Sequence, residues 1–119
     1  MNADDLKKRT RSFALRVLRL AEAIPRGRAA DVVARQMLRS ATSVAANYRA
    51  ACLARSRSEF AAKLGVVQEE ADETVFWIEF AAEAMMVRQG QIAALVKEGK
   101  EILAIMVASR KTAKAAKRT

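Results

Sequence analysis

The sequence predicts an all-α protein, an antiparallel up-down bundle of four helices. Its 119 residues include only four glycines and one proline. That is too few for a β-sandwich or barrel, which needs turn signals about every 8–12 residues. Apolar residues also recur at alternating steps of three and four along most of the chain, which is the period of an amphipathic helix. The length suits one domain with a single core.

The first two helices are expected at residues 4–24 and 28–54, separated by the helix-breaking Pro25 and Gly27. Each presents one core-facing stripe. On the second helix Ala41, Ala45 and Ala46 lie close to the stripe, so this face is small and lets a neighbouring helix approach closely. The two stripes are Leu6, Thr10, Phe13, Val17, Leu20 and Ile24, then Val33, Met37, Ser40, Val44, Asn47 and Ala51.

The third and fourth helices are expected at residues 57–89 and 91–115. Ser56 and Glu59 have the spacing of a capping box, and Gly90 is the residue expected to end the third helix in a left-handed conformation. The stripes are Phe60, Leu64, Val67, Ala71, Thr74, Ile78, Ala81 and Met85, then Ile92, Leu95, Val96, Gly99, Ile102, Leu103 and Met106. Short connections favour antiparallel neighbours. The bundle is therefore assigned to residues 1–109, and residues 110–119 form a basic C-terminal tail.

Several large apolar residues fall outside the predicted core. At 100° per residue, Phe76 and Phe80 lie about 160–200° from the core stripe of their helix, with Trp77 beside them. Leu15 is likewise opposite the core face of the first helix. Either the third helix is rotated and buries its aromatic residues in its own bundle, or these residues contact another subunit, which is the stronger expectation. The candidate oligomer interface is Leu15, Phe76, Trp77 and Phe80.

The composition argues against an enzyme. The chain has no histidine, which excludes Ser-His and Cys-His nucleophile pairs and the histidine-ligated metal centres of helical bundles. The lone Cys52 has no partner for an internal disulfide, and the glycines form no phosphate-binding loop. We therefore expect no catalytic residue, no metal and no cofactor.

The sequence predicts no segment that directs a protein to membranes. Its N-terminal residues 1–11 are polar, without the apolar run of a signal peptide. The longest apolar run, residues 102–108, is far shorter than the roughly 20 residues of a membrane span. A cytoplasmic protein without a membrane partner is expected.

The net charge of +9 is concentrated in one half of the chain. Residues 1–60 contain 13 basic and 5 acidic residues, a balance of +8. A row of arginines on the outer face of the second helix, with a basic tail, suits binding to a phosphate backbone. The candidate nucleic-acid-binding residues are Arg9, Arg16, Arg28, Arg35, Arg39, Arg49, Lys111 and Lys114. Two alternatives remain open: pairing with the acidic third helix of another subunit, or binding of an acidic protein.

Four polar residues lie on or beside the core-facing side of the second helix, where they need hydrogen-bond partners. We expect them to bond one another, the backbone or Glu70, in a network that fixes the helix register. They are Gln36, Ser40, Ser43 and Asn47. A recognition role for Asn47 is the alternative.

Four segments within Leu6 to Met106 carry a resemblance to a known family. They are residues 13–20 with Ile24-Pro25, residues 36–48, Ser56-x-x-Glu59-Phe60-x-x-Lys63-Leu64-Gly65, and residues 69–78. In these segments the chain resembles the small four-helix-bundle proteins encoded in intervening sequences of bacterial 23S ribosomal RNA genes. The resemblance implies a homo-oligomeric ring, with a pentamer favoured, and a likeness to the accessory proteins of diversity-generating retroelements, which bind nucleic acid and a reverse transcriptase. It supplies no catalytic residues. The expected partners are further copies of the chain and ribosomal RNA or another nucleic acid, with a protein partner as the alternative.

Overall fold

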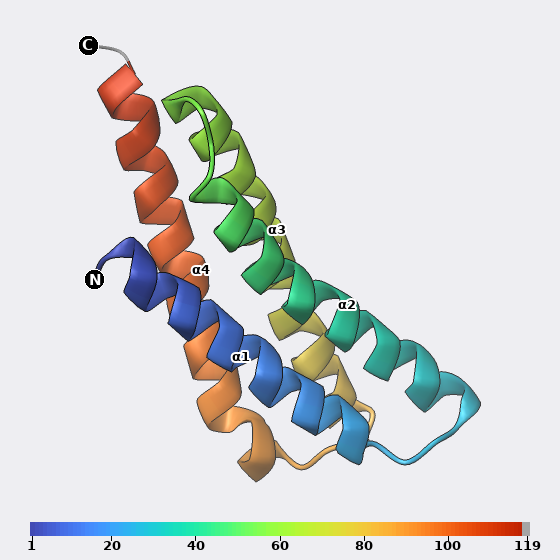
Figure 1. The fold of residues 1–119 in the computed structure, drawn as a ribbon. Coiled ribbons are helices and arrows are strands. Elements are labelled where there is room, and N and C mark those ends of the chain that lie inside the picture. The colour runs from blue at the N-terminus through green and yellow to red at the C-terminus, as the bar shows by residue number, and fades with distance from the viewer. Residues whose placement is uncertain (118–119) are drawn as a thin grey trace.

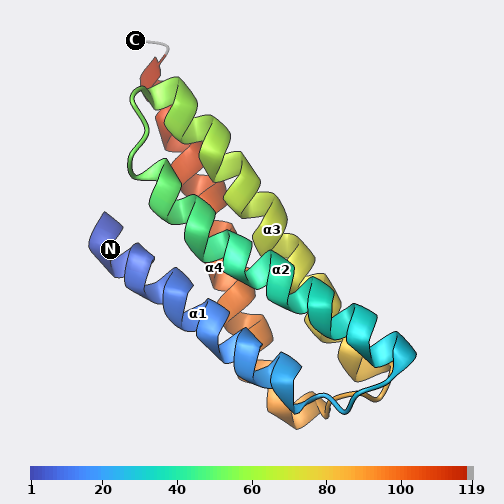
Figure 2. The ribbon, with the colours of Figure 1, turned by 45° about the vertical axis from the view of Figure 1, so that its right-hand side comes forward.

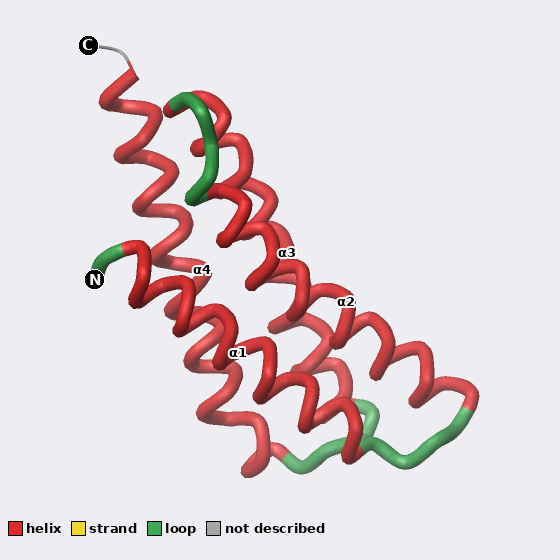
Figure 3. Tube along the Cα trace, viewed as in Figure 1, coloured by secondary structure: helices red, strands yellow, loops and turns green. Residues whose placement is uncertain are grey.

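The computed structural model describes residues 1–117 and contains four α-helices and no strand within them (Figure 1). The helices are α1 (Ala3–Ala23), α2 (Arg28–Ala51), α3 (Arg57–Glu83) and α4 (Gln89–Lys117). Successive helices run in opposite directions and are joined by short loops (Figures 2 and 3). The predicted all-α fold of four helices is confirmed.

Each helix packs mainly against its neighbours in the chain. Contacts are extensive between α1 and α2, α2 and α3, and α3 and α4, and they are sparse between α1 and α4. Helices α1 and α3 therefore lie across one diagonal of the bundle, and α2 and α4 across the other. Helix α4 extends well past the N-terminus of α1 (Figure 1), so that end of the bundle consists of α2, α3 and α4 alone.

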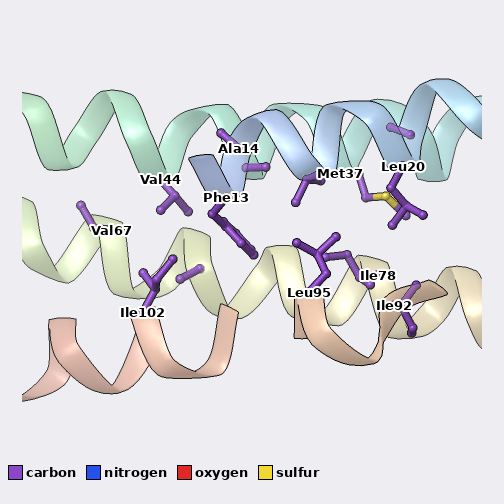
Figure 4. Packing of buried hydrophobic residues seen from close by; sticks show 14 of the residues in the cluster. Phe13, Ala14, Leu20, Met37, Val44, Val67, Ile78, Ile92, Leu95 and Ile102 are labelled. Carbon is purple, nitrogen blue, oxygen red and sulfur yellow. The ribbon is translucent and has the colours of Figure 1, made fainter. Parts of the chain in front are cut away.

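The core follows the stripes that periodicity predicts. Phe13, Met37, Leu64 and Ile102 are fully buried, and the ring of Phe13 points from α1 toward the opposite layer of helices (Figure 4). Exceptions in the predicted stripes are Met85, which is 91% exposed, and four half-buried side chains at the margins of the core. These four are Asn47, Phe60, Val96 and Leu103.

Three hydroxyl groups lie inside the core without disturbing it. Thr10, Ser40 and Thr74 are fully buried. Each donates to the carbonyl four residues earlier, at 2.8, 2.9 and 2.7 Å respectively. A buried hydroxyl that finds its acceptor on its own helix avoids the cost of an unpaired polar group.

The end of α3 differs from the prediction. The helix ends at Glu83, and Met85, rather than Gly90, adopts the left-handed conformation with φ of 62°. The N–H groups of Met85 and Met86 donate to the carbonyls of Ala82 and Ala81 at 3.0 and 2.8 Å, which is the Schellman pattern of a helix C-terminus. The expectation for Gly90 is wrong because a methionine takes the strained position, and Gly90 falls in the first turn of α4.

The start of α3 agrees in part with the predicted capping box. Ser56 Oγ accepts a hydrogen bond from the backbone N–H of Glu59 at 3.1 Å. The carboxylate of Glu59, however, accepts from the backbone N–H of Arg55 at 3.0 Å and not from Ser56. A full capping box occurs where none was predicted, between Asn2 and Asp5 at the start of α1.

The chain shows no structural break at residue 109, where the basic tail was expected to begin. Helix α4 continues to Lys117, and Ala113 is buried within it. The guanidinium of Arg110 lies across Gly65, where an added Cβ would come within 3.3 Å of Arg110 Cζ. Residues 118–119 of the expected tail lie outside the described residues. Over residues 1–117, no helix has an apolar segment long enough to cross a membrane.

Candidate nucleic-acid and subunit interfaces

Arg9 joins the first helix to the last. Its Nε and Nη2 atoms donate to the two carboxylate oxygens of Glu98, each at 2.7 Å, and Nη2 also donates to Glu101 at 2.9 Å. These carboxylates raise the pKa of Arg9 above its usual value, the hydrogen bond with Glu98 contributing most. Arg9 is thus a structural link between α1 and α4, and its guanidinium is already engaged by acidic groups.

Arg39 plays the corresponding part between α2 and α3. Its Nη1 donates to Glu70 at 3.3 Å, and its Nη2 donates to Glu73. The hydrogen bond with Glu73 is the main cause of a raised pKa at Arg39. Because Nε also donates to Gln36 at 3.1 Å, a helix-spanning network engages this arginine too.

The polar residues of α2 are satisfied locally. Asn47 donates through Nδ2 to the carbonyl and the hydroxyl of Ser43 at 3.0 and 2.8 Å, and Gln36 accepts from Arg39. The network reaches Glu70 only through Arg39. The expectation of bonds to one another and to the backbone is confirmed in these contacts.

The other candidate arginines are exposed and have no ion pair within residues 1–117. Arg28, Arg35 and Arg49 stand at multiples of seven residues along the outer face of α2, a spacing that returns to nearly the same side of a helix. Arg16 follows Arg9 by seven residues and so lies on the α4 side of α1. The sequence candidates therefore separate into paired arginines and a free row on α2.

A second concentration of positive charge lies at the three-helix end of the bundle. Lys114 lines a depression of about 210 Å³ together with Arg57 and Arg110, and Lys111 is exposed nearby on α4. We call this region the cationic end; its basic residues are Arg55, Arg57, Arg110, Lys111 and Lys114. The sequence alone placed Arg110 and the two lysines in a basic tail but did not join Arg55 and Arg57 to them, because residues far apart in the chain meet here.

A groove of about 540 Å³ runs between α1 and α2. Its apolar floor includes Leu15, which is 45% exposed, and Leu18. Its rim is basic, with a single acidic residue. The complete lining of this α1/α2 groove is Asp4, Lys7, Lys8, Arg11, Ala14, Leu15, Leu18, Thr42, Ala45, Ala46 and Arg49.

Helix α3, which lies diagonally across the bundle from α1, carries exposed aromatic rings. Phe76 and Phe80 are 52% and 41% exposed, and Trp77 is half-buried between them and the core. The three ring centroids lie 5.0–5.8 Å apart. A rotation of α3 that would bury Phe76 and Phe80 in their own bundle is therefore ruled out. With the exposed acids of the same helical side, these residues form what we call the α3 ridge: Glu69, Asp72, Phe76, Trp77, Phe80 and Glu83.

The four predicted interface residues thus divide between two separate surfaces. Leu15 lies in the α1/α2 groove, whereas Phe76, Trp77 and Phe80 form the α3 ridge. Since α1 and α3 lie across a diagonal, one contact with one neighbour does not cover both. Over residues 1–117, no three carboxylate or thiol side chains are grouped so that they could hold a metal ion.

The arrangement defines a class of protein: a basic four-helix bundle whose outer surface offers arginine rows, an apolar groove and an aromatic ridge. The chain belongs to the 23S rRNA-intervening sequence protein family, whose family model matches residues 4–108. A crystal structure of a protein of unknown function from the S23 ribosomal protein family of Bacteroides thetaiotaomicron is similar, with a TM-score of 0.83 and 30% sequence identity. That match covers 89% of this chain and 98% of the other. The sequence matches no curated protein.

Proposed function

We propose that this protein is a non-enzymatic, cytoplasmic RNA-binding protein that acts as a homo-oligomer. The observation that best supports RNA binding is the free row of arginines on α2: Arg28 and Arg35 are exposed, and no carboxylate of residues 1–117 pairs with them. An unpaired guanidinium can neutralise a phosphate and release its counterions. The cationic end extends this basic character to Lys111 and Lys114.

The free arginines take the leading role in this proposal. Arg9 and Arg39 already hold carboxylates at the contacts of α1 with α4 and of α2 with α3. Binding a phosphate through them would require breaking those ion pairs, which costs part of the gain. Arg28, Arg35, Lys111 and Lys114 offer contacts without that cost, and Arg16 offers a further one on the α4 side of α1.

Oligomerisation would multiply these weak contacts. The exposed Phe76 and Phe80 supply an apolar surface that favours association, and the family resemblance favours a pentameric ring. Repeating the α2 row around a ring would bring several arginines to one RNA and raise the overall affinity by avidity. The absence of histidine from the whole sequence supports a binding role rather than catalysis.

The test is a titration of the protein against a structured ribosomal RNA fragment and a DNA duplex of the same length, at about 50 and 200 mM salt. We expect tighter binding to the RNA that persists at the higher salt. The double variant Arg28→Ala/Arg35→Ala should weaken binding and lower the slope of log affinity against log salt by up to about two.

The matched control is Lys97→Ala/Lys100→Ala, which removes the same charge from the outer face of α4, across the bundle from α2. If both double variants weaken binding equally, the effect reflects net charge and not the α2 row. Equal binding to RNA and DNA that disappears at the higher salt would contradict the proposal. It would favour the alternative of a scaffold oligomer that binds a protein partner.

A further inference from the structure

We propose that the α1/α2 groove of one copy receives the α3 ridge of a second copy. This inference rests on the oligomer of the proposed function and specifies which surfaces meet. It also assigns Arg49, which lies at the rim of the groove, to the contact between subunits and not to RNA binding.

The groove has the chemistry to hold an amphipathic acidic helix. Its floor of alanines with Leu15 and Leu18 is apolar, and both leucines are partly exposed to solvent in the single copy. Lys8 and Arg11 on its rim have no ion pair within residues 1–117. An RNA backbone would use these cations but would gain nothing from an apolar floor without an aromatic ring.

The α3 ridge has the complementary chemistry. Phe76 and Phe80 project from it as the largest exposed apolar side chains of the three-ring cluster. Glu69 and Glu83 lie on the same side of the helix, about four turns apart with Phe76 midway between them, and neither has an ion pair within residues 1–117. An acidic surface of this kind is repelled by RNA, so the ridge calls for a basic, apolar partner.

Charge decides which surfaces can meet. Two ridges face to face would bring the carboxylates of both copies together, and two grooves would bring together four cations from each copy. Both arrangements place like charges opposite each other, which is unfavourable across an interface. Only the groove-to-ridge contact buries leucine and phenylalanine side chains while pairing Lys8 and Arg11 with carboxylates.

The positions of the two surfaces determine the type of assembly. The groove lies between α1 and α2, whereas the ridge lies on α3, diagonally across from α1. A copy docked in the groove therefore leaves its own groove open for the next copy. Such a head-to-tail contact generates a ring when the rotation between copies closes.

The experiment reverses charge on each surface separately and then on both. One variant carries Lys8→Glu/Arg11→Glu in the groove, and another carries Glu69→Lys/Glu83→Lys on the ridge. All four positions are exposed, so folding should be retained, which circular dichroism checks. Sedimentation velocity at near-physiological salt should show assembly weakened by about tenfold or more in each, since like charges now face each other.

The fourfold variant combines both reversals and restores the wild-type net charge of +9. Its acidic groove matches its basic ridge, so it should assemble again to the wild-type size. The control Lys97→Glu/Lys111→Glu makes the same charge change as the groove variant on exposed positions of α4 and should assemble normally.

The outcomes separate this inference from the proposed function. If the wild type assembles and the groove and ridge variants assemble equally well, the groove-to-ridge contact is overturned while the oligomer stands. A folded fourfold variant that stays dissociated also overturns it. A wild-type chain that sediments as a 13.1-kDa monomer overturns the proposed oligomer itself. Loss of RNA binding by the groove variant without any change in assembly would assign the groove to RNA.

Discussion

Arg9 and Glu98 lie 89 residues apart in the sequence, yet two guanidinium nitrogens of Arg9 donate to both carboxylate oxygens of Glu98 at 2.7 Å. One residue further along α4, Gly99 meets the ring of Phe13. The first and last helices are therefore joined at one level by an ion pair beside an aromatic contact. Because contacts between α1 and α4 are otherwise sparse, these two contacts are the main ones that hold α1 against α4.

The substitution Arg9→Met should lower the free energy of unfolding by about 1–2 kcal/mol, because Glu98 loses two charge-assisted hydrogen bonds in a partly buried site. The side chains of Arg9 and Glu98 are 22% and 20% exposed, so solvent screens part of the effect. Urea denaturation measures it, with Arg16→Met as the control on an exposed residue of the same helix. A loss as large in Arg16→Met as in Arg9→Met would show that Glu98 is not the cause.

Gly99→Ala should destabilise the fold by about 1–3 kcal/mol, the usual cost of overpacking a core. The added Cβ would lie 2.7 Å from Val75 Cγ2 and 3.2 Å from Phe13 Cζ, and a helical valine has little freedom to rotate away. Gly90→Ala is the matched control, because nothing lies within 4 Å of its added Cβ. It should stabilise α4 by about 0.4–1 kcal/mol through helix propensity. Thermal denaturation measures the stability of both variants. A stabilised Gly99→Ala together with a destabilised Gly90→Ala would refute this account.

The core could be predicted from the sequence because it depends on periodicity within single helices. Phe13, Val17 and Leu20 follow one stripe, and the structure buries all three. Phe76 and Phe80 also follow from periodicity, as residues on the wrong side of their helix, and both are exposed. Each of these positions is set by the 100° step of a helix and requires no knowledge of its neighbours.

The pairing of charges could not be predicted in the same way. Periodicity places Arg9 and Arg35 alike on outer helical faces, but it does not tell which neighbouring helix turns a carboxylate toward that face. In the structure Arg9 forms an ion pair with Glu98, whereas Arg35 forms no ion pair with any carboxylate of residues 1–117. The end of α3 was missed for a different reason: Met85 has the spacing of a core residue, and its left-handed conformation leaves no signal in a non-glycine residue.

Met85→Gly should raise the free energy of unfolding by about 0.5–1 kcal/mol. Met85 occupies the left-handed region with φ of 62°. A residue with a Cβ is strained in this region, whereas glycine is not. The side chain is 91% exposed, so removing it sacrifices little packing. Met85→Ala, which keeps the Cβ and the strain, is the control and should leave stability nearly unchanged. An equal gain in both variants would point to the lost methionine side chain and not to the backbone.

Arg35 and Arg39 lie one turn apart on α2 and should respond in opposite ways to truncation. Arg39 bonds Glu70 and Glu73 of α3, so Arg39→Ala should lower the melting temperature and leave two neighbouring carboxylates unpaired. Arg35 has no such partner within residues 1–117, so Arg35→Ala should keep the melting temperature while weakening RNA binding about tenfold, as expected for the loss of one charge-assisted phosphate contact. Differential scanning fluorimetry and RNA titration on the same two samples measure both quantities. The division between structural and binding arginines fails if Arg35→Ala unfolds the protein or leaves its RNA affinity unchanged.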